Sequence, residues 1–271
     1  MSDSLPAVAE SDAQGDVAAL FADIRATYRV GVVNLVWRHL ATIEGALPWA
    51  WGAVKPLYVS GHVAAAASAI RAARPLPPVA PLPAEVTACA GLDPAARAEV
   101  ARVIGAYDRA NPMALAALSL LQARLSGGIA PGEARAPLHE DAAEVPLPPL
   151  PALEGLAPPV AALVRRANAI ATEGDAPILA SLYRHLALWP PALALSWAVL
   201  APREAALRQA IAATRALALD EAARLAPLLP EAPPPPAPEA THAALARFTG
   251  DAIGRMVVLG GVLAVAFGPE G

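Results

Sequence analysis

Two short segments that carry the same polar side chains stand far apart in the chain. Residues 37–41 read WRHLA, and residues 183–187 read YRHLA. Arg38 and Arg184 could each offer a guanidinium fork to the carboxylate of a small acid. His39 and His185, if they meet, could form a proton-handling pair. The alternative is structural: each arginine ties its helix to a neighbouring carbonyl or carboxylate, and each histidine is partly exposed and bonded to nearby backbone.

Carboxylates that could serve as a general base are few. Glu173 and Asp175 lie in a turn before an apolar segment that begins at Ile178. Either could activate a water molecule if the turn faces a cleft. The alternative is a solvated turn in which an acid caps the next helix. Asp23 stands two residues before Arg25, and a salt bridge or tether is its expected role.

Other side chains that often carry chemistry favour structural roles here. Cys89 is the one cysteine, so neither an intramolecular disulfide nor a multi-cysteine zinc site can form. Its alanine-rich surroundings predict an inert buried thiol. No metal-ligand spacing, glycine-rich phosphate loop or nucleophile elbow is present, so we expect no metal and no cofactor. Four tryptophans are expected in the core first and as pocket walls second: Trp37, Trp51, Trp189 and Trp197.

The composition of the 271 residues limits the classes of function. Hydrophobic residues make up 56% of the chain, which is enough for a large core. A net charge of −4 gives no basic excess for nucleic-acid binding. The longest strongly apolar stretch, Met256 to Phe267, is shorter than the roughly 20 residues of a membrane span and indicates a buried helix. The first residues lack a signal-peptide pattern, so we expect a soluble cytoplasmic protein without a membrane partner.

An internal repeat organises the chain. Ordered pairs match along both halves: Leu47 with Leu193, Trp51 with Trp197, Pro56 with Pro202, Arg102 with Arg247, and Gly105 with Gly250. These pairs predict two copies of a unit of about 130 residues, the first at 16–125 and the second at 160–268. Residues 126–159 contain Gly127-Gly128, an acidic patch at 139–144 and many prolines, and they predict an irregular linker.

The periodicity inside each copy is helical. Apolar residues recur at steps of three and four over 16–28, 62–73, 94–107, 112–125 and 203–225. Asp93 before Pro94 is typical of an N-cap followed by proline at the first helical position, and Asn111 before Pro112 repeats the pattern. Residues 32–36 have the composition of a strand but lack a partner strand nearby. The predicted fold is all-α, with two tandem helical repeats packed on each other as a pseudo-dimer.

Several short stretches occur in the order that one known family shows. They are Ala22–Arg25, Arg29-Val30, Arg38, Leu40–Thr42, Leu47-Pro48, Ala50-Trp51, Tyr107, Asn111-Pro112, Leu186-Ala187, Trp189-Pro190 and Leu200–Pro202. In these stretches the chain resembles the group I DL-2-haloacid dehalogenases, a family of halocarboxylic acid dehalogenases. The resemblance implies an all-helical protein with a site between the two copies. It also implies hydrolysis of a carbon–halogen bond next to a carboxylate: a protein carboxylate activates water, which displaces halide with inversion and without a cofactor.

The same resemblance assigns residues to the site and reveals a departure. Asn111 matches an asparagine that helps to hold the reacting water, and Ser181 matches the serine that precedes the water-activating aspartate. Leu182 occupies the position of that aspartate, and leucine cannot accept a proton. Two aromatic positions of the family correspond to Val32 and Leu35. A pocket walled by these apolar residues and Trp37 is expected, with Arg38 or Arg184 available to an acid.

Two functions remain open at this point. One is a hydrolytic 2-haloacid dehalogenase whose activity is lost or altered, unless Glu173, Asp175 or a histidine replaces the missing base. The other is a non-catalytic small-molecule-binding or structural protein on the same scaffold. The expected ligand is a small carboxylic acid or a small apolar molecule, and either function is compatible with a homodimer.

Overall fold

The chain folds almost entirely into helices. A computed structural model describes residues 5–139, 145–173 and 177–269, and these residues contain no strand. The one β-type pairing among them is an isolated bridge between Val30 and Val145. The prediction of an all-α protein is confirmed.

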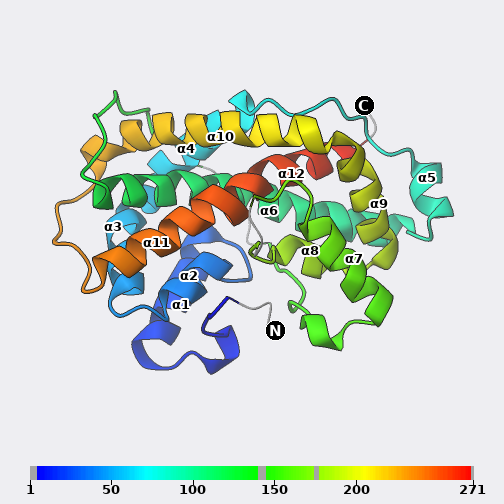
Figure 1. The fold of residues 1–271 in the computed structure, drawn as a ribbon, viewed down its shortest axis with the longest axis horizontal. Helices are drawn as coiled ribbons and strands as arrows, with labels where there is room; N and C mark the ends of the chain where they lie inside the picture. Colours follow the sequence, from blue (N-terminus) through cyan, green and yellow to red (C-terminus); the bar gives the residue numbers. More distant parts are fainter. Residues whose placement is uncertain (1–4, 140–144, 174–176, 270–271) are drawn as a thin grey trace.

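Twelve α-helices occur in the described residues, joined by short 3₁₀ or π segments (Figure 1). The first six are α1 (Gly15–Tyr28), α2 (Leu35–Leu40), α3 (Ala46–Val59), α4 (His62–Ala73), α5 (Ala84–Cys89) and α6 (Pro94–Leu125). The others are α7 (Pro158–Asn168), α8 (Ser181–Leu186), α9 (Pro190–Leu200), α10 (Glu204–Leu225), α11 (Pro238–Arg247) and α12 (Ile253–Ala266). The short segments are η1 (Glu10–Asp12), η2 (Leu153–Gly155), η3 (Ala201–Arg203), η4 (Ala226–Leu228) and the π-helical η5 (Phe248–Ala252).

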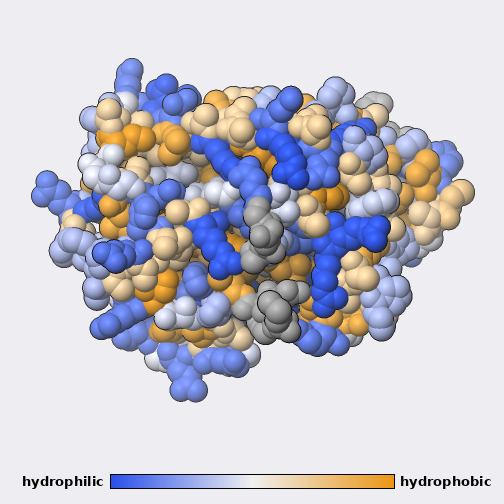
Figure 2. Space-filling model, in the orientation of Figure 1, coloured by the Kyte–Doolittle hydropathy of each residue, from blue (hydrophilic) through white to orange (hydrophobic). Residues whose placement is uncertain are grey.

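The long helices form the centre of the molecule. Figure 1 shows α1–α3 at one end and α7–α9 at the other, with α6, α10 and the α11–α12 run between them. The long helix α6 packs against α4, α10, α11 and α12. On the face shown in Figure 2, hydrophilic and hydrophobic side chains are intermixed rather than gathered into one large apolar patch.

The two halves of the chain share their hydrophobic cores. One cluster contains Trp37, Trp51 and the C-terminal half of α6, together with residues of α10 and α11 from the second half of the chain. The other contains α7–α9 and most of α12, together with Val100, Val103 and Ile104 of α6. Each cluster therefore depends on helices from both halves.

The helix α6 corrects one sequence prediction. We expected two helices, with Asn111 as the N-cap of the second, but α6 runs unbroken from Pro94 to Leu125 with Pro112 inside it. A proline inside a helix costs about 3 kcal/mol because it removes a backbone hydrogen bond. Every residue from Ala110 to Leu121 is buried, and burial of this apolar surface offsets that cost. The predicted N-cap Asp93 is confirmed, since its side chain accepts a hydrogen bond from the Ala96 N–H at 2.8 Å.

The apolar C-terminal stretch is a core helix. The continuous run Pro238–Ala266 is long and apolar enough to span a membrane by composition, but 78% of its most apolar window is buried inside the protein. Gly261 lies against the guanidinium of Arg74, which bridges Asp108 at 2.6 Å and donates to the Val257 carbonyl at 2.8 Å. These contacts lock α12 against α4 and α6, as expected for the interior of a helical bundle.

The predicted linker is partly ordered into structure. Residues 140–144 of the acidic patch lie outside the described residues. Beyond them, Val145 pairs with Val30, η2 forms at 153–155, and α7 begins at Pro158. The linker therefore contains short regular elements that sequence periodicity did not indicate.

Candidate functional site

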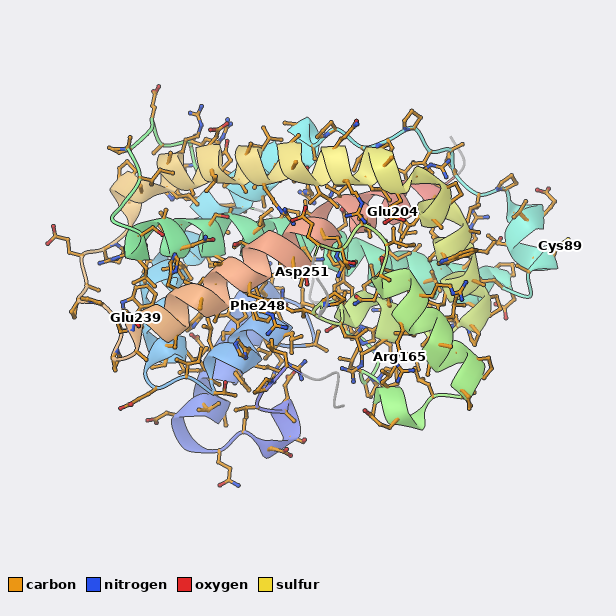
Figure 3. The ribbon with its side chains drawn as sticks, in the orientation of Figure 1. Cys89, Arg165, Glu204, Glu239, Phe248 and Asp251 are labelled. Carbon is orange, nitrogen blue, oxygen red and sulfur yellow. The ribbon has the colours of Figure 1, made fainter. Side chains whose placement is uncertain are left out.

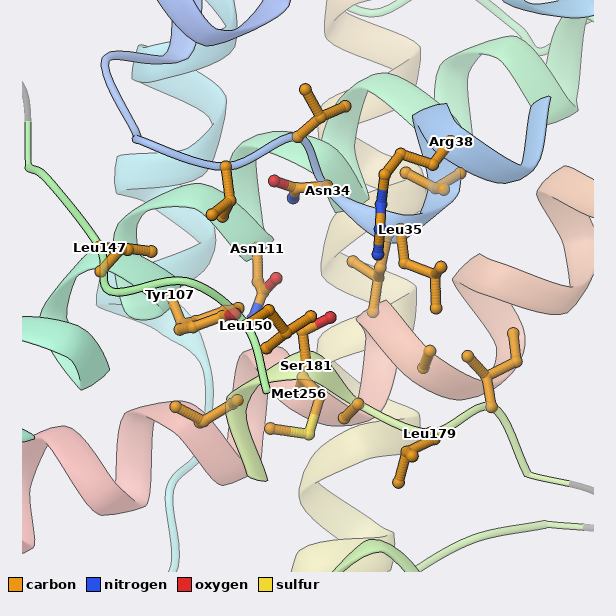
Figure 4. Close-up of a pocket in the computed structure, with 18 of the residues that line it drawn as sticks. Asn34, Leu35, Arg38, Tyr107, Asn111, Leu147, Leu150, Leu179, Ser181 and Met256 are labelled. Atoms are coloured by element: carbon orange, nitrogen blue, oxygen red, sulfur yellow. The ribbon is translucent and has the colours of Figure 1, made fainter. Parts of the chain in front are cut away.

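A cavity of about 460 Å³ lies between the two halves of the chain (Figure 4). Its walls come from residues 31–36 and Arg38 around the start of α2, residues 178–182 at the start of α8, one turn of α6, and the beginning of α12. The linker segment 147–150 and Glu10-Ser11 close the remaining sides. Most of these side chains are apolar, as is usual for a small-molecule site.

The structure brings six predicted site residues together around this cavity. They are Val32, Leu35, Arg38, Asn111, Ser181 and Leu182. Figure 4 shows the side chains of Asn111 and Ser181 among those that line the cavity. Leu182 is only 1% exposed, so the residue that we align with the family's aspartate is an apolar part of the wall.

Two residues predicted for the pocket lie elsewhere. Trp37 is fully buried in the core, where its Nε1–H donates to the Tyr28 hydroxyl at 3.3 Å and its ring meets Trp51 edge-on. A large aromatic ring contributes more to stability when it is packed in the core than when it lines an open cavity. Arg184 points away from the cavity because its Nε and a terminal nitrogen donate to the Pro151 carbonyl at 2.8 and 2.6 Å. It lines an adjacent cavity of about 440 Å³.

Arg38 is the cation that faces the ligand space. It lines both cavities, and Figure 4 shows its guanidinium directed into the larger one. Its Nε is buried and has no hydrogen-bond partner among the residues that the structure describes. Burial lowers the pKa of Arg38, while Glu10 and Tyr107 act in the opposite direction. The guanidinium remains charged at neutral pH and can pair with an anion.

One acidic residue at the cavity was missed by sequence reasoning. Glu10 lines the wall, but both of its carboxylate oxygens are engaged. Oε1 accepts from the Val33 N–H at 2.8 Å, and Oε2 pairs with Arg25 at 2.5 Å. Because Glu10 lies outside the predicted repeat and its partners follow 15 to 23 residues later, no local pattern pointed to it.

The other acids named from the sequence do not reach the cavity. Glu173 is 63% exposed and pairs with Arg215 at 3.2 Å, in line with the solvated alternative. Asp175 lies outside the described residues. Asp23 is tethered, but to Lys55 at 2.8 Å and to the Trp51 indole N–H at 2.7 Å rather than to Arg25. The hydrogen bonds from these two partners lower the pKa of Asp23.

The two histidines have different surroundings. His39 is half-buried and bonds the Pro6 carbonyl through Nδ1 at 2.6 Å. His185, expected to be partly exposed, is fully buried, with Nδ1 at 2.7 Å from the Tyr107 hydroxyl and Nε2 at 2.9 Å from the Pro148 carbonyl. Burial lowers the pKa of His185. Neither histidine lines the central cavity, although Tyr107 connects His185 to it.

Two further predictions concern cysteine and tryptophan. Cys89 is exposed at the end of α5 (Figure 3), not buried as its alanine-rich neighbours suggested, because α5 is a short helix at the molecular edge. Trp51 is buried as predicted, whereas Trp189 and Trp197 are half-buried. None of these residues lines the central cavity.

No family model matches the chain. A configuration-inverting 2-haloacid dehalogenase of Alcaligenes xylosoxydans xylosoxydans is 33% identical over 118 residues, which is 43% of this chain and 40% of that protein. The match thus spans about two fifths of that relative's length.

Solved structures of a D-2-haloacid dehalogenase cover 97% of this chain and 94% of their own at 18% identity. The complex of a mutant with D-2-CPA gives a TM-score of 0.73, and the complex with L-LA gives 0.74. These structures share the all-helical fold. The chain is therefore similar in sequence to a 2-haloacid dehalogenase over part of its length, and it shares the fold of a D-2-haloacid dehalogenase over nearly all of it.

Proposed function

We propose that this dehalogenase-like protein binds a small carboxylic acid in its central cavity and does not hydrolyse the carbon–halogen bond by the family's route. One observation carries the proposal: among the described residues, the cavity contains no carboxylate that is free to accept a proton from water. Leu182 occupies the wall where we place the aspartate, and Glu10 is held by Arg25 and Val33. General-base catalysis requires such a group within hydrogen-bond reach of the water.

Arg38 supports the assignment of an acid as ligand. A guanidinium binds a carboxylate through charge-assisted, often bidentate, hydrogen bonds. The unpartnered Nε and the direction of the side chain into the cavity leave that bonding capacity for a ligand. Asn111 and Ser181 supply further polar contacts in an otherwise apolar wall. The related D-2-haloacid dehalogenase is described in complexes with D-2-CPA and L-LA, which agrees with a small acid.

A small apolar ligand is the second candidate, because most of the residues in the wall are apolar, chiefly aliphatic side chains with two prolines and a phenylalanine. Such a ligand would leave Arg38 without a partner in a half-buried site, which costs free energy. An acid with a short apolar chain satisfies both parts of the wall. We therefore favour the acid.

The two-copy architecture belongs to the same proposal. The segments 32–36 and 178–182, which we align between the copies, both line the cavity, and α2 and α8 begin and end at aligned positions. These placements support two copies at 16–125 and 160–268 that share one site. A cytoplasmic location and a homodimer remain predictions of the sequence.

Two measurements test the proposal. Titration calorimetry with propionate and 2-chloropropionate should show binding that Arg38→Met weakens about 10- to 100-fold, because a hydrogen bond to a charged group contributes about 1.5–3 kcal/mol. Arg208→Met, which removes an exposed arginine paired with Glu204, is the control. Ion chromatography should detect no chloride release from 2-chloropropionate. Chloride release that Glu10→Gln abolishes would refute the absence of a base.

A further inference from the structure

A chain of hydrogen bonds with a fixed direction leads from the linker to the cavity. The Pro148 carbonyl can only accept, so the Nε2 of His185 at 2.9 Å carries a hydrogen and donates it. In the neutral imidazole, Nδ1 then has no hydrogen, and its lone pair accepts a hydrogen bond from the Tyr107 hydroxyl at 2.7 Å. The hydrogen of Tyr107 is therefore directed away from the ligand space.

The direction of these hydrogen bonds decides what the wall of the cavity offers to a ligand. With its hydrogen bonded to His185, the Tyr107 oxygen can only accept further hydrogen bonds. Ser181 lines the same cavity as Tyr107, and its hydroxyl lowers the pKa of Tyr107, as a hydrogen-bond donor does. Both residues line the cavity, so the wall offers oxygen lone pairs from Tyr107 and Ser181. The amide of Asn111 can donate or accept, and so it does not discriminate.

We infer that the cavity selects small acids that carry a hydrogen-bond donor beside the carboxylate, as a 2-hydroxy acid does, over 2-halo acids of similar size. This inference rests on the proposed function, in which Arg38 binds the carboxylate. A ligand hydroxyl can donate to the Tyr107 or Ser181 oxygen. A carbon-bound chlorine has no hydrogen to donate, so these half-buried oxygens gain no hydrogen bond from it. A site built to hydrogen-bond a hydroxyl rejects an analogue that lacks it.

Burial keeps both Tyr107 and His185 uncharged at neutral pH. Burial raises the pKa of Tyr107, and Arg38 and Arg184 only partly oppose this shift, so the phenol keeps its hydrogen. Burial lowers the pKa of His185, Arg184 lowers it further, and the bond to Pro148 acts in the opposite direction. A neutral histidine beside a neutral tyrosine is the combination that the direction of the chain requires.

Calorimetry at pH 7.5 with lactate, 2-chloropropionate and propionate tests the inference. We expect lactate to bind at least 10-fold more tightly than either of the other acids. Tyr107→Phe removes one of the two oxygen acceptors and should lower this ratio, mainly by weakening the binding of lactate. Tyr183→Phe is the matched control, because Tyr183 is buried outside the cavity and its hydroxyl has no partner among the described residues. It should leave the ratio unchanged.

Nitrogen-15 NMR of the histidine ring gives an independent readout. The inference requires His185 to be protonated on Nε2 and unprotonated on Nδ1 at pH 7.5. The opposite tautomer would overturn it, as would equal affinities for lactate and 2-chloropropionate in the unmodified protein. If the two affinities are equal, the proposed function stands, since both acids bind. If none of the three acids binds, the proposed function fails and the inference falls with it.

Discussion

Replacing Leu182 with aspartate would put a carboxyl group into the cavity wall that also holds Asn111 and Ser181. Leu182 is 1% exposed, so the new carboxyl would be almost completely buried. Removing a fully buried leucine side chain typically costs about 2–5 kcal/mol. Burial disfavours the ionised form, and each unit by which the pKa rises adds about 1.4 kcal/mol of instability once the group is ionised.

The pH dependence separates these two contributions. The aspartate in the unfolded chain has a pKa of about 3.9, and in the folded protein the pKa would be higher. Well below pH 4 both states are protonated and only the packing loss remains. As the pH rises from about 4 to the folded pKa, the unfolded state ionises first and the stability of Leu182→Asp falls. Above the folded pKa the loss is constant.

Urea unfolding from about pH 2.5 to 8 covers this profile on both sides of the unfolded pKa. Leu182→Asn has a similar shape without the charge, so the difference between the two variants isolates ionisation. Leu188→Asp is the exposed control, because Leu188 is 41% exposed just after α8, and its profile should be flat above pH 5. Chloride release from 2-chloropropionate should appear in Leu182→Asp alone, since a positioned general base contributes about 10²–10⁴-fold. A carboxyl at position 182 that titrates near 4 would refute our register for the second copy.

Three further predictions concern residues outside this exchange. The free energy of unfolding of the unmodified protein should decline as the pH falls below about 6.5, because His185 takes up a proton in the unfolded chain more readily than when it is buried. In His185→Gln this decline should be smaller. Urea midpoints that change equally with pH in the two proteins would contradict the prediction. Gly261→Ala should lower the free energy of unfolding by about 1–3 kcal/mol, because its Cβ would lie 2.5 Å from Arg74, whereas the Gly260→Ala control meets no atom within 4 Å. Cys89 should react with a thiol reagent without denaturant, and protection would show that it is covered.

Helical periodicity predicted elements well where local sequence and packing agree. The helix at His62–Ala73 was predicted with its observed bounds, since its apolar residues recur on one face and glycine and arginine flank it. At Asn111-Pro112 local sequence and packing disagree. The local signal favours a break, but the segment lies in the centre of the bundle, and burial holds it helical. Tertiary burial is not visible in a window of a few residues, which is why this prediction was wrong.

The site shows the same division between local and distant signals. Val32, Leu35, Asn111 and Ser181 could be named from a resemblance because they stand in or close to ordered motifs. The partners that decide their chemistry are distant in sequence. The Tyr107–His185 bond joins residues 78 positions apart, and no spacing rule in a single sequence pairs them.

The cavity is bounded by two kinds of wall, and the difference has a kinetic consequence. Helices supply one part of the wall. The segments 5–12 and 145–150 contain no α-helix. A few backbone hydrogen bonds hold them, such as those from the Val8 N–H to the Arg38 carbonyl and from the Gly31 N–H to the Val145 carbonyl. Segments held in this way open with a smaller free energy than the global fold. We therefore expect exchange of a ligand to proceed by local opening of these two segments, so that its rate tracks amide hydrogen exchange at Val8 and Gly31 and is independent of the much slower exchange within α6.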